Sequence, residues 1–101
     1  MDIKLEGRQV ELGDELRERI QKRMENLDQR FGPITHARVS IEVKAHKNDQ
    51  RAEAKAVVNV AGTTITATKE NSTVVASVND VLDTLTKELK DHVERSKKKR
   101  R

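Results

Sequence analysis

The chain contains no cysteine, tryptophan or tyrosine, and it has one phenylalanine and one proline. Without cysteine, neither a disulfide framework nor a thiolate metal site can form. Because Phe31 is the only aromatic residue, the core must be aliphatic, and stacking of exposed rings on nucleic-acid bases is not expected. No apolar run has the length of a signal peptide or a membrane span, which favours a cytoplasmic location.

The composition is compatible with one small folded domain. Apolar residues make up 34% of the 101 residues and charged residues 38%, which approaches the range of disordered chains. The apolar residues nevertheless recur with regular helical and strand periods, which indicates a packed core. We predict a single α+β domain over residues 1–94 and a basic, disordered tail over residues 95–101.

Positive charge is concentrated at the C-terminal end. The formal net charge is +4, and the tail alone holds six cations, so the preceding 94 residues carry a net charge of −2. If the folded part binds a polyanion, it must therefore use clustered charge rather than overall charge. The tail itself is interpreted as an arm that binds RNA or as a solubilising end, and the arm is favoured. Its basic residues are Arg95, Lys97, Lys98, Lys99, Arg100 and Arg101.

The segment from Gly13 or Asp14 to Phe31 has the apolar spacing of an amphipathic helix. Gly32 and Pro33 end it, and we expect Gly32 to adopt a left-handed cap conformation. Leu16, Ile20, Met24, Leu27 and Phe31 form its apolar stripe. At about 100° per residue, one flank of the stripe is basic, with Arg19, Lys22, Arg23 and Arg30. A solvated face with ion pairs one helical turn apart is an equally weighted interpretation of this flank.

Alternating apolar and polar residues predict four strands, at Ile3–Gly7, His36–Ala45, Ala52–Val60 and Thr63–Thr68. A tight turn at Ala61-Gly62 joins the last two strands, with Gly62 supplying a positive φ. The alanines of the third strand leave room for a closely packed helix. A second amphipathic helix follows, capped by Asn71 or Ser72, with an apolar face of Val74, Val75, Val78, Val81, Leu82, Leu85, Leu89 and Val93.

The predicted order is β-α-β-β-β-α, which gives an α+β fold with a four-stranded mixed sheet. Because each strand has one apolar side, both helices must cover the same face of the sheet. The first two strands, joined through a helix, are predicted to be parallel. The other face stays in water and carries Arg38, Lys44, Arg51 and Lys55 among Glu42 and Glu53.

Several anchor motifs accompany this order, and together they carry a resemblance. They are Val10-Glu11-Leu12-x-x-x-Leu16-Arg17-Glu18, Lys22-x-x-x-x-Leu27-x-x-x-Phe31, Val39-x-Ile41-x-Val43, Val60-Ala61-Gly62 and Leu82-x-x-Leu85-x-x-x-Leu89-Lys90. With them the chain resembles the ribosome hibernation-promoting factor family, also described as ribosome-associated inhibitor A, ribosomal subunit interface protein or sigma-54 modulation protein. The likeness extends from Ile3 to about Lys90.

The resemblance implies a fold like that of double-stranded-RNA-binding domains, and a translation inhibitor acting in stationary phase or stress. Such a factor binds the small ribosomal subunit and its rRNA where mRNA and tRNA bind, and holds whole ribosomes inactive. The family's basic positions correspond to Lys22 and Arg23 in the first helix, and to Lys87, with Lys90 and Arg95 nearby, in the second. The full set of predicted RNA- or ribosome-binding residues is Arg19, Lys22, Arg23, Arg30, Lys87, Lys90, Arg95, Lys97 and Lys98.

The sequence departs from the family pattern at three places. Thr73-Val74-Val75 stands where the family commonly has Asp-Met-Tyr, Thr84 occupies a frequently basic position, and Gly13 replaces the usual Ser or Thr helix cap. We expect no counterpart of the second domain that the long form of the family has, and the chain is most similar to the short form. Because of the three substitutions, we do not expect every family contact to be retained, least of all an aromatic one.

No catalytic or metal-binding pattern is recognisable. The histidines are far apart in sequence, no glycine-rich phosphate loop occurs, and no nucleophile–base order is present. We therefore expect neither enzymatic activity nor a cofactor, a metal, a small-molecule substrate or a membrane partner. Two alternatives remain beside the ribosome-binding inhibitor. One is a generic module for structured RNA, and the other is a protein-interaction regulator, such as a modulator of a sigma factor.

Overall fold

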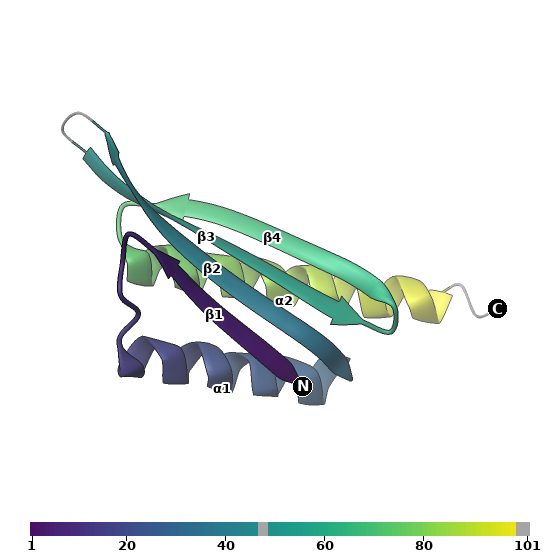
Figure 1. Ribbon diagram of the computed structural model, residues 1–101. Coiled ribbons are helices and arrows are strands. Elements are labelled where there is room, and N and C mark those ends of the chain that lie inside the picture. Colours follow the sequence, from purple (N-terminus) through teal and green to yellow (C-terminus); the bar gives the residue numbers. More distant parts are fainter. Residues whose placement is uncertain (47–48, 99–101) are drawn as a thin grey trace.

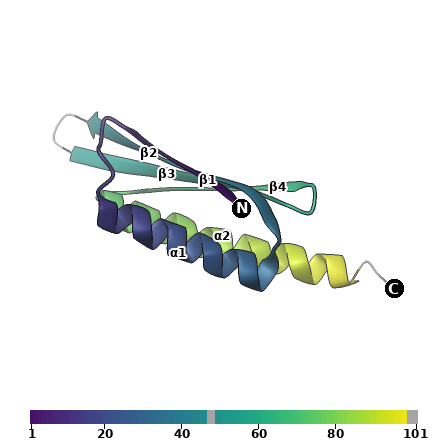
Figure 2. The ribbon, with the colours of Figure 1, turned by 60° about the horizontal axis from the view of Figure 1, so that its bottom comes forward.

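The computed structural model describes residues 1–46 and 49–98, and they form two layers (Figure 1). The elements are β1 (Asp2–Arg8), α1 (Asp14–Phe31), β2 (Ile34–His46), β3 (Asp49–Val60), β4 (Thr63–Asn71) and α2 (Val74–Lys98). The four strands form one sheet, and α1 and α2 run side by side across one of its faces (Figures 1 and 2). The predicted β-α-β-β-β-α order and the covering of a single face are both confirmed.

The sheet has the strand order β1-β2-β3-β4. Strand β1 is parallel to β2, with Leu5 opposite Val39, whereas β2–β3 and β3–β4 are antiparallel pairs. The parallel pair is the one that α1 connects, because parallel neighbours need a long crossover segment between them. This confirms the predicted mixed sheet.

The core lies between the sheet and the helices and is aliphatic, as predicted. Every second residue of β2 and β3 faces it, and Ala54 and Ala56 are fully buried there. These small side chains allow α2 to approach β3 closely, so that the Ser77 hydroxyl donates a hydrogen bond of 2.6 Å to the Ala52 carbonyl oxygen. The largest fully buried side chains include Ile20, Met24, Leu27, Ile41, Leu82, Leu85 and Leu89.

Helix α1 ends at Gly32 for a reason other than the predicted one. Gly32 has φ −71° and ψ −168°, which is extended backbone and not a left-handed cap. Its amide donates to the Asp28 carbonyl oxygen at 2.9 Å, and the Asp28 carboxylate accepts a 2.7 Å hydrogen bond from the Ile34 amide. A Cβ at Gly32 would overlap the Asp28 carbonyl oxygen. Glycine is therefore required by the close approach of the backbone.

The start of α2 also differs from the prediction. Strand β4 continues to Asn71, and the helix is capped by Thr73, whose hydroxyl oxygen accepts a 3.1 Å hydrogen bond from the Ala76 amide. Asn71 instead accepts a hydrogen bond from the Ser72 amide and donates one to Asp80. The prediction of Asn71 or Ser72 as the helix cap is therefore wrong. Val75, predicted on the apolar face, is 48% exposed.

Strands β2 and β3 and helix α2 are longer than the sequence predicts. Strands β2 and β3 extend beyond the ends of the helices (Figure 1), so Ala45, predicted to face inward, is exposed. Helix α2 runs to Lys98, so its backbone includes residues 95–98, for which the sequence predicts a disordered tail. Residues 99–101 lie outside the described part of the chain. Within the part that is described, no helix combines the length and apolarity needed to cross a membrane.

Candidate nucleic-acid interface

The basic flank of α1 is presented on the surface. Arg19 and Lys22 are exposed, and with Glu15, Glu18 and Asn26 they line a shallow hollow along the helix. Among residues 1–46 and 49–98, neither cation forms an ion pair with a carboxylate. Their charge is therefore available to a ligand, although the two glutamates beside them moderate the local field.

Arg23 is held by the second helix. Its Nη2 atom lies 3.0 Å from the Asp83 Oδ1 atom and 3.5 Å from the Thr86 hydroxyl oxygen. The side chain is 38% exposed and that of Asp83 is 65% exposed, so the pair is worth at most about 1 kcal/mol of stability. Arg23, a predicted RNA-binding residue, thus forms an ion pair that connects α1 to α2.

Arg30 lies at the last turn of α1, where a cation complements the helix dipole. Its guanidinium carbon is 4.9 Å from the centroid of the Phe31 ring, a cation–π distance. Phe31 is half-buried against the core. Arg30 is exposed, so it continues the line of cations that begins at Arg19.

The predicted cations of α2 are spread around that helix. Lys87, Lys90 and Arg95 are all exposed. Lys90 follows Thr86 by one helical turn and so lies on the side that faces α1, whereas Arg95 is about 140° further round the helix. Lys97 and Lys98 belong to the helical backbone of α2, but their side chains lie outside the described ones. The structure therefore brings Lys90 toward the α1 flank and separates Arg95 from it.

A second group of cations, which the sequence analysis did not select as a site, lies on the sheet side opposite the helices. We call this side the open sheet face. Two hollows occur on it. Arg38, Ser40 and Lys55 line one of them together with Glu6, Glu42 and Glu53, and Lys4, His36 and Arg38 line the other together with Asp2, among other residues. Sequence alternation places Arg38 and Lys55 on this face. Their adjacency to Lys4 depends on the strand register, which the sequence pattern did not supply.

The described part of the chain contains no group of three or more His, Asp or Glu side chains arranged to hold a metal ion. It also contains no buried side-chain nitrogen or oxygen atom without a hydrogen-bond partner. The candidate site is therefore defined by exposed charge rather than by a buried constellation.

Relatives of this chain carry ribosome-related names. It is 30% identical over 97 residues to a ribosome hibernation promotion factor of Deinococcus radiodurans, a match that covers 95% of this chain but 51% of the relative. It is 25% identical over 95 residues to a ribosome hibernation promoting factor of Azotobacter vinelandii, covering 94% of this chain and 85% of the relative. The chain thus spans about half the length of the Deinococcus protein. Both relatives are named for a role at the ribosome and not for an enzymatic reaction.

A solved structure shows the same fold. A ribosomal subunit interface protein from Coxiella burnetii superposes with a TM-score of 0.73 at 22% identity, covering 93% of this chain and 99% of that one. The model of the family described as sigma 54 modulation protein / S30EA ribosomal protein matches residues 3–97. Because this match takes in all six elements of the fold, the chain belongs to the sigma 54 modulation protein / S30EA ribosomal protein family.

Proposed function

We propose that this protein binds the small ribosomal subunit and holds ribosomes inactive during stationary phase or stress. The observation that carries the proposal is the family match over residues 3–97, together with a relative named ribosome hibernation promoting factor of which the chain covers 85%. In this proposal the protein contacts rRNA where mRNA and tRNA bind, and it acts by occupying that space rather than by catalysis. Binding to ribosomes would put the protein in the cytoplasm.

The chemistry of the helix surface supports contacts to phosphates. Arg19 and Lys22 are exposed and Arg30 extends their line, whereas the chain has no tryptophan or tyrosine to stack on bases. Lysine and arginine contacts to phosphates position a protein on folded RNA without reading its sequence. Such binding must weaken as salt rises, because each phosphate contact releases counterions.

The test is sedimentation of the protein with ribosomes and separated subunits at two salt concentrations. We expect the protein to co-sediment with small subunits and whole ribosomes at low salt. The double variant Arg19→Gln with Lys22→Gln should bind about 5- to 20-fold more weakly and lower the salt slope by about 2. Gradient profiles of the same samples will report whether ribosomes pair.

The control variant combines Gln21→Glu with Lys69→Gln. It lowers the net charge by the same two units at exposed positions, one of them on α1, but away from the basic flank. It should bind almost like the wild type. Equal loss in both variants would mean that overall charge, rather than this surface, controls binding. Absence of the wild-type protein from all ribosomal fractions at low salt would disprove the proposal.

Two alternative functions are separated by the same samples. The family description also names sigma 54 modulation, and a regulator of that kind would form a protein complex insensitive to salt. A generic module for structured RNA would bind ribosomal RNA and unrelated RNA duplexes with equal affinity. Unrelated duplex RNA or a sigma factor is therefore added to the samples in excess. If neither competitor displaces the protein from ribosomes, the hibernation role is favoured.

A further inference from the structure

The open sheet face is an exposed surface made of alternate residues from all four strands. Helices α1 and α2 cover only the opposite face (Figures 1 and 2). Strand register sets the neighbours on the open face: Lys4 lies opposite Arg38, Ser40 opposite Lys55, and Lys55 opposite Thr68. This face carries about as many carboxylates as cations, and ion pairs within the protein neutralise part of these charges.

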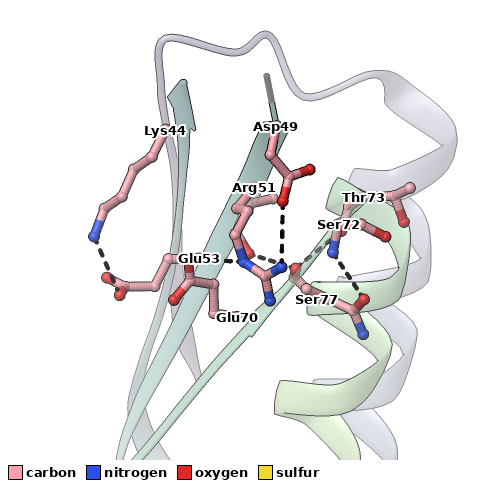
Figure 3. Close-up of polar contacts among 10 residues, drawn as sticks. Lys44, Asp49, Arg51, Glu53, Glu70, Ser72, Thr73 and Ser77 are labelled. Atoms are coloured by element: carbon pink, nitrogen blue, oxygen red, sulfur yellow. Dashed lines mark hydrogen bonds and ion pairs between the residues drawn. The ribbon is translucent and has the colours of Figure 1, made fainter. Parts of the chain in front are cut away.

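The charged side chains near the end of β2 and the start of β3 form ion pairs. Lys44 lies 3.3 Å from Glu53, and Arg51 lies 3.2 Å from Glu70 and 3.8 Å from Asp49 (Figure 3). On β1, Arg8 lies 3.6 Å from Glu6. These three cations are shared among four carboxylates. Glu42 forms no ion pair among the described residues, and Asp2 lies 3.8 Å from His36 alone, which is an ion pair only when that histidine is protonated.

Three cations of the open sheet face have no such partner within the described part of the chain: Lys4, Arg38 and Lys55. We call them the basic strip. All three are exposed. Lys4 and Arg38 are opposite each other on the parallel strands β1 and β2, so their like charges repel. Arg38 lines one hollow with Lys4 and the other with Lys55, so the three cations are neighbours on this face. Carboxylates share both hollows with them: Asp2 in the first, and Glu6, Glu42 and Glu53 in the second.

We infer that the basic strip is a second RNA-binding surface, which contacts the phosphate backbone of an RNA segment. Local arrangements that cost stability are expected at functional sites, and an anionic ligand would relieve this one. Hydroxyl groups of Ser40, Thr66 and Thr68 lie on the same face and can hydrogen-bond to phosphates or 2′-hydroxyls. The inference rests on the proposed function for the nature of the ligand, and it adds a surface on the side away from the helices.

A protein partner fits this face less well than RNA. The centre of a protein–protein interface is usually apolar and depleted of charge. Among the described residues of the open sheet face, the only apolar side chain is Val57, which is half-buried between Arg38 and Lys55. Contacts on both faces would place the two-layered protein between two RNA segments, with the helices on one and the basic strip on the other.

The test compares two triple variants that each lower the formal net charge from +4 to +1. The strip variant carries Lys4→Gln, Arg38→Gln and Lys55→Gln. The control variant carries Gln21→Glu, Gln50→Glu and Lys69→Gln, all at exposed positions off the open sheet face. Binding is measured to purified small ribosomal subunits and, separately, to a labelled RNA hairpin with a stem of about 16 base pairs, across a salt series. Thermal melts check that both variants fold.

We expect the strip variant to bind small subunits at least about tenfold more weakly and to lower the salt slope by about 2 to 3, with little change in the control. Equal affinities of strip variant and wild type for both ligands would overturn the inference and leave the proposed function intact. A loss that does not depend on salt would also overturn it, because a protein surface would then be the partner.

The hairpin measurement separates this inference from the proposed function. If the wild type fails to bind subunits but binds the hairpin, and the strip variant loses that binding, the proposed function fails and the strip remains an RNA surface. If the wild type binds neither ligand, both are wrong.

Discussion

Arg23 lies on the flank of α1 that faces α2, where Asp83 and Thr86 hold its guanidinium group. The helical pattern places this arginine beside Arg19 and Lys22, but no local pattern gives its partner, which is 60 residues further along the chain. An arginine in an exposed ion pair can exchange its carboxylate for a phosphate at modest cost, because such pairs are weak. The Asp83 carboxylate thus competes with any RNA phosphate for this side chain.

This competition predicts opposite effects for the two members of the ion pair. Arg23→Gln should weaken ribosome binding about 3- to 10-fold, since a phosphate contact is lost. Asp83→Asn should leave binding unchanged or tighten it about two- to threefold, because it releases the arginine. Pelleting isotherms at low salt measure both affinities.

Both substitutions break the same ion pair, so each should lower the free energy of unfolding by less than about 1 kcal/mol. Thermal melts test this, and each variant serves as the control for the other. If Arg23→Gln and Asp83→Asn weaken binding to the same extent, Arg23 acts only in holding α1 against α2.

At the scale of elements, the hairpin between β3 and β4 depends on an unusual backbone. Ala61 has φ 51° and Gly62 has φ 79°, so both central residues occupy the left-handed region, as in a type I′ turn. Glycine tolerates this conformation, whereas alanine is strained in it. The Ala61-Gly62 turn was predicted from the sequence, but the positive φ was expected for Gly62 and not for Ala61.

The turn therefore offers two substitutions with opposite signs. Ala61→Asn creates the Asn-Gly pair preferred in type I′ turns and should stabilise the protein by about 0.5 to 1 kcal/mol. Gly62→Ala should destabilise it by about 1 to 2 kcal/mol, since the new side chain would sit at a positive φ. Denaturant unfolding with a common m-value measures both free energies. A lower denaturation midpoint for Ala61→Asn would contradict the type I′ assignment.

At the scale of the whole molecule, charge is distributed over two faces and the C-terminal end. The net charge of +4 comes from the last seven residues, since the preceding part has a net charge of −2. Both proposed RNA surfaces are thus local clusters on a body of nearly balanced charge. Under such a distribution the C-terminal cations contribute long-range attraction, while the clusters on α1 and on the open sheet face fix the orientation.

If the C-terminal cations supply long-range attraction, neutralising the last three residues should weaken binding without affecting the fold. The variant Lys99→Gln, Arg100→Gln and Arg101→Gln keeps the length of the chain and lowers the net charge to +1. It should weaken binding to ribosomes about 3- to 10-fold at low salt and lower the salt slope by about 1 to 3, without changing the melting temperature. A variant with Ser residues at the same positions controls for the glutamine side chains. Unchanged affinity and slope would identify the end of the chain as a solubilising segment.

The sequence pattern was sufficient to predict the order of the elements, the parallel pairing of the two strands that α1 connects, and the aliphatic core. Two-residue alternation marks which strand residues are buried, and three- to four-residue spacing marks the helical stripes, because each element has one face away from water. The predictions that differ from the structure concern the ends of helices and strands. Thr73 caps α2 in place of Asn71, and residues 95–98 extend the helix, since an element's end depends on what packs beside it.

Local periodicity and composition were thus enough to predict most of the buried residues, the basic flank of α1 and the place where the net charge is concentrated, whereas Val75 and Ala45 were exceptions. Only the tertiary structure decided which exposed charges are neighbours. Strand register sets Lys4 opposite Arg38, and helix packing brings Asp83 to Arg23. Contacts between residues distant in sequence arise from the packing of whole elements, and a shift of two residues in strand register would keep every buried face while changing which charges lie opposite one another on the sheet.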